Sequence, residues 1–159
     1  MQIVRRIENH NEKRDEINEK QIALLKDKLQ KNISRQEYGL AIDIGTTTIA
    51  MSCYDLSTGE WLGNCQEMNS QCMMGSDVVM RLMHCQQGKQ ERLQRLVVEQ
   101  LEEMAEKICK TICSLEDIRK MTVVGNATMC HIFAGQDAIG LAGSTFRTAY
   151  QGTLRCKGE

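Results

Sequence analysis

Three short segments between Tyr38 and Asn69 alternate apolar and polar residues, and short turns separate them. They are YGLAIDIG, TTTIAMSCYDL and EWLGNCQEMN, and β-branched residues are frequent in the first two. Between the second and the third lies Ser57-Thr58-Gly59, where glycine allows the positive φ of a tight turn. Because the connections are so short, the sequence predicts an antiparallel meander of three strands.

Two helical patterns follow the meander. Residues 76–87, SDVVMRLMHCQQ, start with Ser76 or Asp77 as a candidate N-cap, and Gly88 interrupts the pattern. Residues 89–114 form a longer amphipathic pattern, in which apolar residues recur at helical spacing. Its apolar face comprises Leu93, Leu96, Val97, Leu101, Met104, Ile108 and Ile112. Both segments are predicted to be helices.

A further strand and a further helix come next. KMTVVGN, residues 120–126, has the pattern of a short buried strand, and ATMCHIFAG, residues 127–135, has that of a helix closed by Gly135. A strand placed after a long helix suggests a crossover connection, so the sheet is predicted to be mixed. The predicted fold class is therefore α/β, with helices packed on a mixed sheet.

Residues 1–36 differ from the rest of the chain because they are densely charged, with both signs intermixed. A loose apolar stripe, with acidic and basic residues at helical-neighbour spacing, predicts a long solvated helix. Either a leader or linker helix, or a docking helix through which the chain self-associates, fits this pattern. The sequence thus divides into a charged helix at 1–36 and a domain at 37–159.

Charge and hydropathy exclude several classes of partner. The formal net charge is −1 and the isoelectric point is about 6.3, which gives no electrostatic basis for binding nucleic acid or an anionic membrane surface. The chain has no apolar run long enough to span a membrane, and its N-terminus is too polar for a secretory signal. A cytoplasmic location is therefore predicted.

Eight cysteines occur without any C-x-x-C pair, so the sequence shows neither a zinc ribbon nor a ferredoxin-type cluster loop. Cys109 and Cys113 lie one helical turn apart and are interpreted as small apolar residues on a helix face. A metal or cluster shared with another chain is the alternative, and a redox role of either cysteine is left open. His84 and His131 are interpreted as satisfied packing residues rather than as ligands or bases.

The main candidate site is the DIGTTT segment, Asp43–Thr48, at the first turn of the meander. Gly45 allows the backbone to approach a ligand closely, and successive N–H groups and threonine hydroxyls would offer donors to phosphate oxygens. The hydroxyls are those of Thr46, Thr47 and Thr48. Since Asp43 would repel phosphate, the pattern implies Mg²⁺ held through water. The alternative is an ordinary β-turn with threonines as strand formers, and a P-loop is excluded because no G-K-[ST] follows.

The segment AIDIGTTTIAMSCYDLSTGE resembles the first phosphate loop of the superfamily of acetate kinases, sugar kinases, heat-shock ATPases and actin, called ASKHA. Two later segments make the resemblance more specific. EMNSQCMMGSDVVMRL and VVGNATMCHIFAGQDAIGLAGSTF are similar, in the same order, to segments of the ASKHA domain in the reductive activators of corrinoid proteins. The resemblance extends from about Tyr38 to Gln151, and it implies a half-lobe of a ribonuclease H-like, actin-like ATPase fold.

Such activators couple ATP hydrolysis to an uphill electron transfer that restores cob(I)alamin on a methyl-transferring corrinoid protein, and they carry an iron–sulfur cluster in a separate domain. The resemblance therefore implies ATP and Mg²⁺ as ligands and a corrinoid protein as partner. It also implies that Asp43 orients Mg²⁺ or its waters, and that Gly45, Thr46 and Thr47 contact the phosphates. Asn126 would face the cleft, although capping of the following helix explains an asparagine there equally well.

The chain also departs from that family. Ser70 stands where the family usually has proline, the prolines usual after Phe146 are missing, and no cluster-binding cysteine motif precedes the domain. A second phosphate loop and the adenosine-binding glycines are not recognisable, so we expect an incomplete ASKHA domain that needs a second lobe or chain and is not a competent ATPase alone. Two alternatives are the opening lobe of an ASKHA sugar or small-acid kinase, and a non-enzymatic interaction module that docks through residues 1–36.

Overall fold

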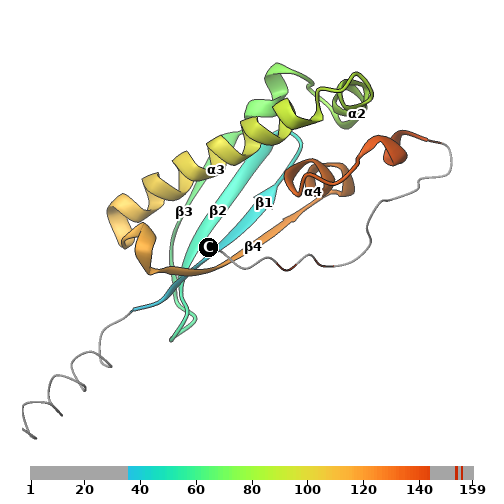
Figure 1. Cartoon of the computed structure of the whole chain (residues 1–159). Helices are drawn as coiled ribbons and strands as arrows, with labels where there is room; N and C mark the ends of the chain where they lie inside the picture. Colours follow the sequence, from blue (N-terminus) through green and yellow to red (C-terminus); the bar gives the residue numbers. More distant parts are fainter. Residues whose placement is uncertain (1–35, 144–152, 154, 156–159) are drawn as a thin grey trace, which may run out of the picture. The chain divides into compact units, whose positions relative to one another are not determined.

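The computed structural model describes residues 36–143, 153 and 155, and the statements below concern these residues. The charged helix predicted at 1–36 lies outside the described residues apart from Gln36, and so does the segment that contains Phe146. Within the domain that follows Gln36, a sheet carries a long helix along one of its faces (Figure 1). The predicted α/β class is confirmed.

In the described part of the chain, the sheet has four strands in the order β3-β2-β1-β4. β1 (Tyr38–Ile44), β2 (Thr48–Asp55) and β3 (Trp61–Met68) form an antiparallel meander, and β4 (Ile118–Gly125) pairs with β1 in parallel. The predictions of a meander and of a mixed sheet are therefore confirmed. Because β1 and β4 are parallel neighbours, their carboxyl ends, at Ile44 and Gly125, lie side by side.

Three α-helices are described: α2 (Val78–Gln86), α3 (Gln90–Ile112) and α4 (Ala127–Phe133). The 3₁₀ turns are η1 (Ser70–Met73), η2 (Leu115–Asp117) and η3 (Ile139–Ala142). Asp77 caps α2, because its Oδ1 accepts a hydrogen bond from the Met80 N–H at 2.9 Å. Gly88 and Gly135 have φ of 74° and 65° and follow the ends of α2 and α4. None of the described helices has the length and apolar character that crossing a bilayer requires.

The core lies between α3 and the two central strands (Figure 1). Five of the seven residues predicted for the apolar face of α3 are buried, and Leu96 and Ile112 are half-buried. The buried five are Leu93, Val97, Leu101, Met104 and Ile108. They share one cluster with alternate residues of β1 and β2, namely Leu40, Ile42, Ile44, Ile49, Met51 and Cys53. Burial of this apolar surface is the main favourable contribution to folding.

β4 is a strand, as predicted, but its predicted burial is wrong. Met121 keeps 52% and Val124 keeps 55% of its surface exposed. The strand lies at the edge of the sheet, and Val124 pairs with Asp43 on the face opposite to the core residue Ile42. An apolar run indicates a strand, but only the long-range pairing decides whether that strand is central or at an edge.

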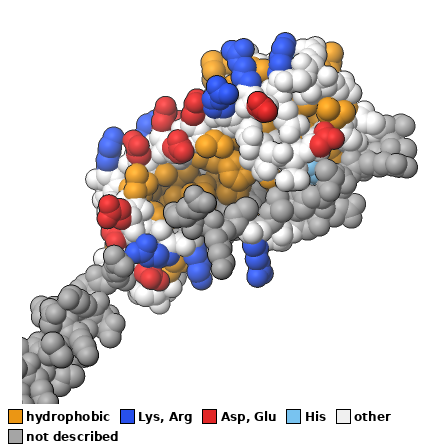
Figure 2. All heavy atoms as spheres, viewed as in Figure 1, with side chains coloured by type: hydrophobic (Ala, Val, Ile, Leu, Met, Phe, Trp, Pro, Cys, Tyr) orange, Lys and Arg blue, Asp and Glu red, His pale blue; other side chains and the backbone are white. Residues whose placement is uncertain are grey.

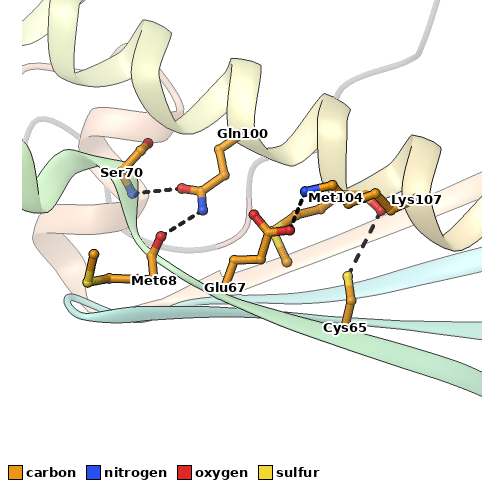
Figure 3. Close-up of polar contacts among 7 residues, drawn as sticks. All are labelled: Cys65, Glu67, Met68, Ser70, Gln100, Met104 and Lys107. Carbon is orange, nitrogen blue, oxygen red and sulfur yellow. Dashed lines mark hydrogen bonds and ion pairs between the residues drawn. The ribbon is translucent and has the colours of Figure 1, made fainter.

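Gln100 connects the middle of α3 to the junction between β3 and η1 (Figure 3). Its side-chain amide donates to the Met68 carbonyl oxygen at 2.8 Å, and its Oε1 accepts from the backbone N–H of Ser70 at 2.8 Å. The Ser70 hydroxyl donates in turn to the Leu96 carbonyl oxygen at 3.0 Å. The chain that leaves β3 is therefore held against α3, next to the turn between β1 and β2 that Asn69 contacts.

Candidate functional site

The six residues that the sequence singled out lie together at one end of the sheet. Asp43 is near the end of β1, Gly45, Thr46 and Thr47 form the turn, and Thr48 begins β2. Asn126 directly follows β4, and the parallel pairing of β4 with β1 brings it beside the turn, although it is 80 positions from Thr46 in the sequence. The predicted site is therefore one place in the folded chain.

The backbone of the turn is held tightly. A Cβ at Gly45 would lie 2.5 Å from the Thr48 carbonyl oxygen, so this position requires glycine. Asn69 binds two carbonyl groups of the turn: its side-chain amide donates to the Gly45 oxygen at 2.8 Å, and its backbone N–H donates to the Thr47 oxygen at 2.7 Å. Sequence reasoning did not assign Asn69 to the site, although the residue lies in the segment EMNSQCMMGSDVVMRL, which contributes to the family resemblance.

Arg81, on α2, holds the remaining carbonyl group of the turn and was also missed by sequence reasoning. Its side chain is completely buried, and Nη2 donates a hydrogen bond to the Thr46 carbonyl oxygen. The Cys72 thiol lies 3.6 Å from the same oxygen. Burial is the main cause that lowers the pKa of Arg81 from its ordinary value. A guanidinium nevertheless stays protonated at physiological pH, so a fixed positive charge lies next to the turn.

Asn126 connects the turn to α4. Its Nδ2 donates to the Thr46 Oγ1 at 3.1 Å, and its Oδ1 accepts from the Met129 N–H at 3.1 Å, which caps the helix. Capping, one of the two interpretations of this asparagine, is therefore confirmed. Because the same side chain also holds the Thr46 hydroxyl, a role of Asn126 toward a ligand stays a prediction.

Asp43 and the threonines keep groups available to a ligand. Asp43, Thr47 and Thr48 are exposed. Within the described residues, the Asp43 carboxylate has no hydrogen bond or ion pair, and the N–H groups of Thr46 and Thr47 have no acceptor. Burial, and then the nearby Asp43 carboxylate, raise the pKa of the Cys130 thiol. A free carboxylate beside free N–H groups fits Mg²⁺ held through water together with phosphate oxygens.

Residues 38–159 match the family described as RACo middle region. The chain belongs to this family. It is 32% identical over 99 residues to the corrinoid activation enzyme RamQ of Eubacterium limosum, a match that covers 60% of the chain and 17% of RamQ. It is also similar to the solved structure of a reductive activator for corrinoid, iron-sulfur protein, with 32% identity and a TM-score of 0.71 over 73% of the chain and 19% of that protein. The chain thus spans about a fifth of the length of these relatives.

Membership of this family confirms the predicted resemblance to the activators of corrinoid proteins. The match begins at residue 38, which is the first residue of β1, so it includes the whole four-stranded sheet and the candidate site. The structural similarity likewise means that part of a reductive activator shares this mixed α/β fold.

The other candidate residues do not join this site. Cys109 is buried, as its interpretation as an apolar residue predicts, and its Sγ lies 3.5 Å from that of Cys113. In the described part of the chain, no three His, Cys, Asp or Glu side chains gather to hold a metal ion. The Nδ1 of His131 is hydrogen-bonded to the Ala127 carbonyl oxygen at 2.7 Å. The Nδ1 of His84 is buried without a partner among the described residues, so the predicted satisfied packing is wrong for that atom.

Proposed function

We propose that the chain is part of an ATP-dependent reductive activator of corrinoid proteins, and that its Asp43–Thr48 turn is the first phosphate-binding loop of an ASKHA, actin-like ATPase fold. Both relatives are named for activating corrinoid proteins, which supports the activator assignment. One observation carries the phosphate assignment: the Asp43 carboxylate and the N–H groups of Thr46 and Thr47 are unbonded within the described residues.

Each residue of the turn has a role in this proposal. Asp43 orients Mg²⁺ through its bound waters, and the cation offsets the repulsion between carboxylate and phosphate. Gly45 keeps the turn tight, and Thr46 and Thr47 donate N–H groups to phosphate oxygens. Thr48 offers an exposed hydroxyl. Asn126 keeps the Thr46 hydroxyl in place through the hydrogen bond that joins them.

The nucleotide would supply the free energy for an uphill electron transfer to the cobalt of a corrinoid protein. ATP hydrolysis depends on holding several groups in register around the phosphates, and the turn provides one set of them. In this proposal a second lobe or chain supplies the groups that bind the adenosine and the remaining phosphates. The iron–sulfur cluster of such an activator would lie outside the described residues.

Titration of the chain with Mg-ATP by isothermal calorimetry tests the phosphate assignment. We expect weak binding, and Asp43→Ala should weaken it about tenfold, which corresponds to the loss of one charge-assisted interaction. In EDTA, the effect of Asp43→Ala on nucleotide affinity should have the opposite sign. Without Mg²⁺ the Asp43 carboxylate repels phosphate, so Asp43→Ala should bind free ATP at least as well as the wild type.

Asp117→Ala is the matched control for this titration. Asp117 immediately precedes β4, at the end of the sheet opposite to the turn, so its removal takes away the same charge far from the site. It should change neither titration. The phosphate assignment is wrong if the wild-type chain binds no Mg-ATP, or if Asp43→Ala binds Mg-ATP as well as the wild type does.

A further inference from the structure

Arg81 uses every side-chain donor to connect three separate segments of the chain. A guanidinium has five N–H groups. In this protein they meet five acceptors from the β1–β2 turn, the segment around η1, and α4. Nε donates to the Gly75 carbonyl oxygen at 3.0 Å. Nη1 donates to Gln71 Oε1 at 3.0 Å and to Met129 Sδ at 2.8 Å. Nη2 donates to the Thr46 carbonyl oxygen and to Cys72 Sγ, the latter at 3.4 Å.

The positive charge of Arg81 is stabilised by dipoles but not neutralised. All five acceptors are uncharged groups, and no carboxylate of the described residues forms an ion pair with the guanidinium. Asp77 acts on Arg81 electrostatically, but its carboxylate caps α2 through the Met80 N–H. Burying a charge is unfavourable unless polar groups surround it, and these five acceptors meet that need. An unpaired cation therefore lies directly against the Thr46 peptide group.

The carbonyl groups of the turn are bound by neighbouring residues, and this fixes the direction of its N–H groups. Asn69 binds the Gly45 carbonyl and Arg81 binds the Thr46 carbonyl. In a trans peptide the C=O and the next N–H point in opposite directions, and the described chain has no cis peptide. The N–H of Thr46 therefore points away from Asn69, and the N–H of Thr47 points away from Arg81. Successive N–H groups oriented in this way form an anion-binding concavity.

We infer that Arg81 is a positioning residue for the phosphate site: its bond to the Thr46 carbonyl aims the Thr47 N–H at the ligand, and its unpaired charge favours the more highly charged nucleotide. The identity of the ligand rests on the proposed function. The positioning of the turn rests only on the contacts of Arg81, which does not touch the ligand itself. Mg-ATP should accordingly bind in preference to Mg-ADP.

Three variants separate the parts of this inference. Arg81→Gln removes the charge and the planar donor fork, Arg81→Lys keeps the charge without the fork, and Arg95→Gln removes an exposed arginine of α3 as the matched control. The first measurement is the backbone ¹⁵N order parameter of Thr46 and Thr47 in the ligand-free chain. We expect a fall from about 0.85 to below about 0.6 in both Arg81 variants and no change in Arg95→Gln. Wild-type order parameters in a folded Arg81 variant overturn the inference.

The second measurement is the affinity for Mg-ATP and for Mg-ADP. Arg81→Gln should weaken Mg-ATP binding about tenfold and reduce its preference over Mg-ADP, whereas Arg81→Lys should retain that preference. An unchanged preference in Arg81→Gln overturns the role of the charge. If Arg81→Gln does not fold, Arg81→Lys decides through its order parameters. If the wild type binds neither nucleotide, the proposed function fails, while the order parameters still decide whether Arg81 positions the turn.

Discussion

The thiol of Cys53 is buried on β2, and this burial, with a smaller contribution from Cys113, raises its pKa from 9.0 to about 11. Burial therefore favours the neutral thiol, and keeping this thiol protonated stabilises the folded state relative to the unfolded state. Its contribution is fully present below pH 9, where the unfolded thiol is also protonated, and is lost as the pH rises through 11. Within this window the free energy of unfolding should fall, by at most about 1.4 kcal/mol per pH unit for this one group.

Urea unfolding of the wild type and of Cys53→Ala, from about pH 7.5 to about pH 10.5, tests this dependence at a single residue. At the lower pH the variant should be less stable by about 1 kcal/mol, because a small cavity replaces the sulfur. The wild-type advantage should shrink as the pH rises above 9 and reverse toward about pH 10.5, since alanine has no thiol to ionise. Parallel curves would show instead that Cys53 ionises equally in both states.

Residues of the candidate site differ in how far the sequence reveals them. Asp43, Gly45 and Thr46 are recognisable as candidates, because a carboxylate, a glycine and a hydroxyl close together in the sequence are the groups that the proposed phosphate loop would use. Arg81 is not recognisable, because its neighbours in the sequence indicate only a short helix. Its partners, such as Thr46 and Met129, come from distant segments. The sequence shows the chemistry that a side chain offers, but it does not show which long-range contacts a buried charge makes.

Among the elements, η1 is held to α3 by the hydrogen bonds of Ser70. The family that this segment resembles usually has proline at that position. Asn69 has φ −61° and ψ 117°, an extended conformation that tolerates a following proline. Proline would nevertheless remove the N–H that Ser70 donates to Oε1 of the buried Gln100, and this oxygen would lose the donor that Ser70 supplies, although the amide nitrogen keeps its bond to Met68. Ser70→Pro should therefore lower the free energy of unfolding in urea by about 1–3 kcal/mol.

Ser70→Ala is the matched variant for this test. It keeps the backbone N–H and loses only the hydroxyl bond to the Leu96 carbonyl oxygen, for an expected decrease of about 0.5–1.5 kcal/mol. Ser70→Pro should thus be the less stable of the two. A proline variant as stable as Ser70→Ala would mean that the bond from Ser70 to Gln100 contributes nothing.

Elements are predictable from the sequence where a local pattern decides them. The alternation from Tyr38 onward, the positive φ of Gly59 and the Asp77 cap are all local, and the structure contains each of them. The exposure of β4 is different. Its apolar run specifies a strand, but its place at the edge results from pairing with β1, which is far away in the sequence. Pairing across the sheet, and hence burial, belongs to the folded chain as a whole.

Across the whole molecule, the order of the strands determines which backbone hydrogen bonds open first. β1 has paired neighbours on both sides, and its residues Leu40, Ile42 and Ile44 are buried in the core. Among the residues that the structure describes, β4 pairs on one side only, and most of its residues are exposed. Local opening requires least free energy where few buried contacts are lost. In native-state hydrogen exchange, β1 amides should therefore exchange most slowly, and β4 amides markedly faster.

Figure 2 shows that charged and apolar side chains are intermixed on the visible surface of this domain. A variant of α3, whose side chain lies beneath that surface, distinguishes global from local opening of the sheet. Met104 is completely buried, so Met104→Ala should lower the free energy of global unfolding by about 2–5 kcal/mol. Amides of β1 that exchange through global unfolding should lose the same amount. Amides of β4 should keep their exchange rates, because their opening does not expose the core beneath α3. Arg95→Gln, on the exposed side of α3, should alter neither strand. If Met104→Ala accelerates both strands equally, the sheet opens as one unit and the edge position of β4 does not weaken it.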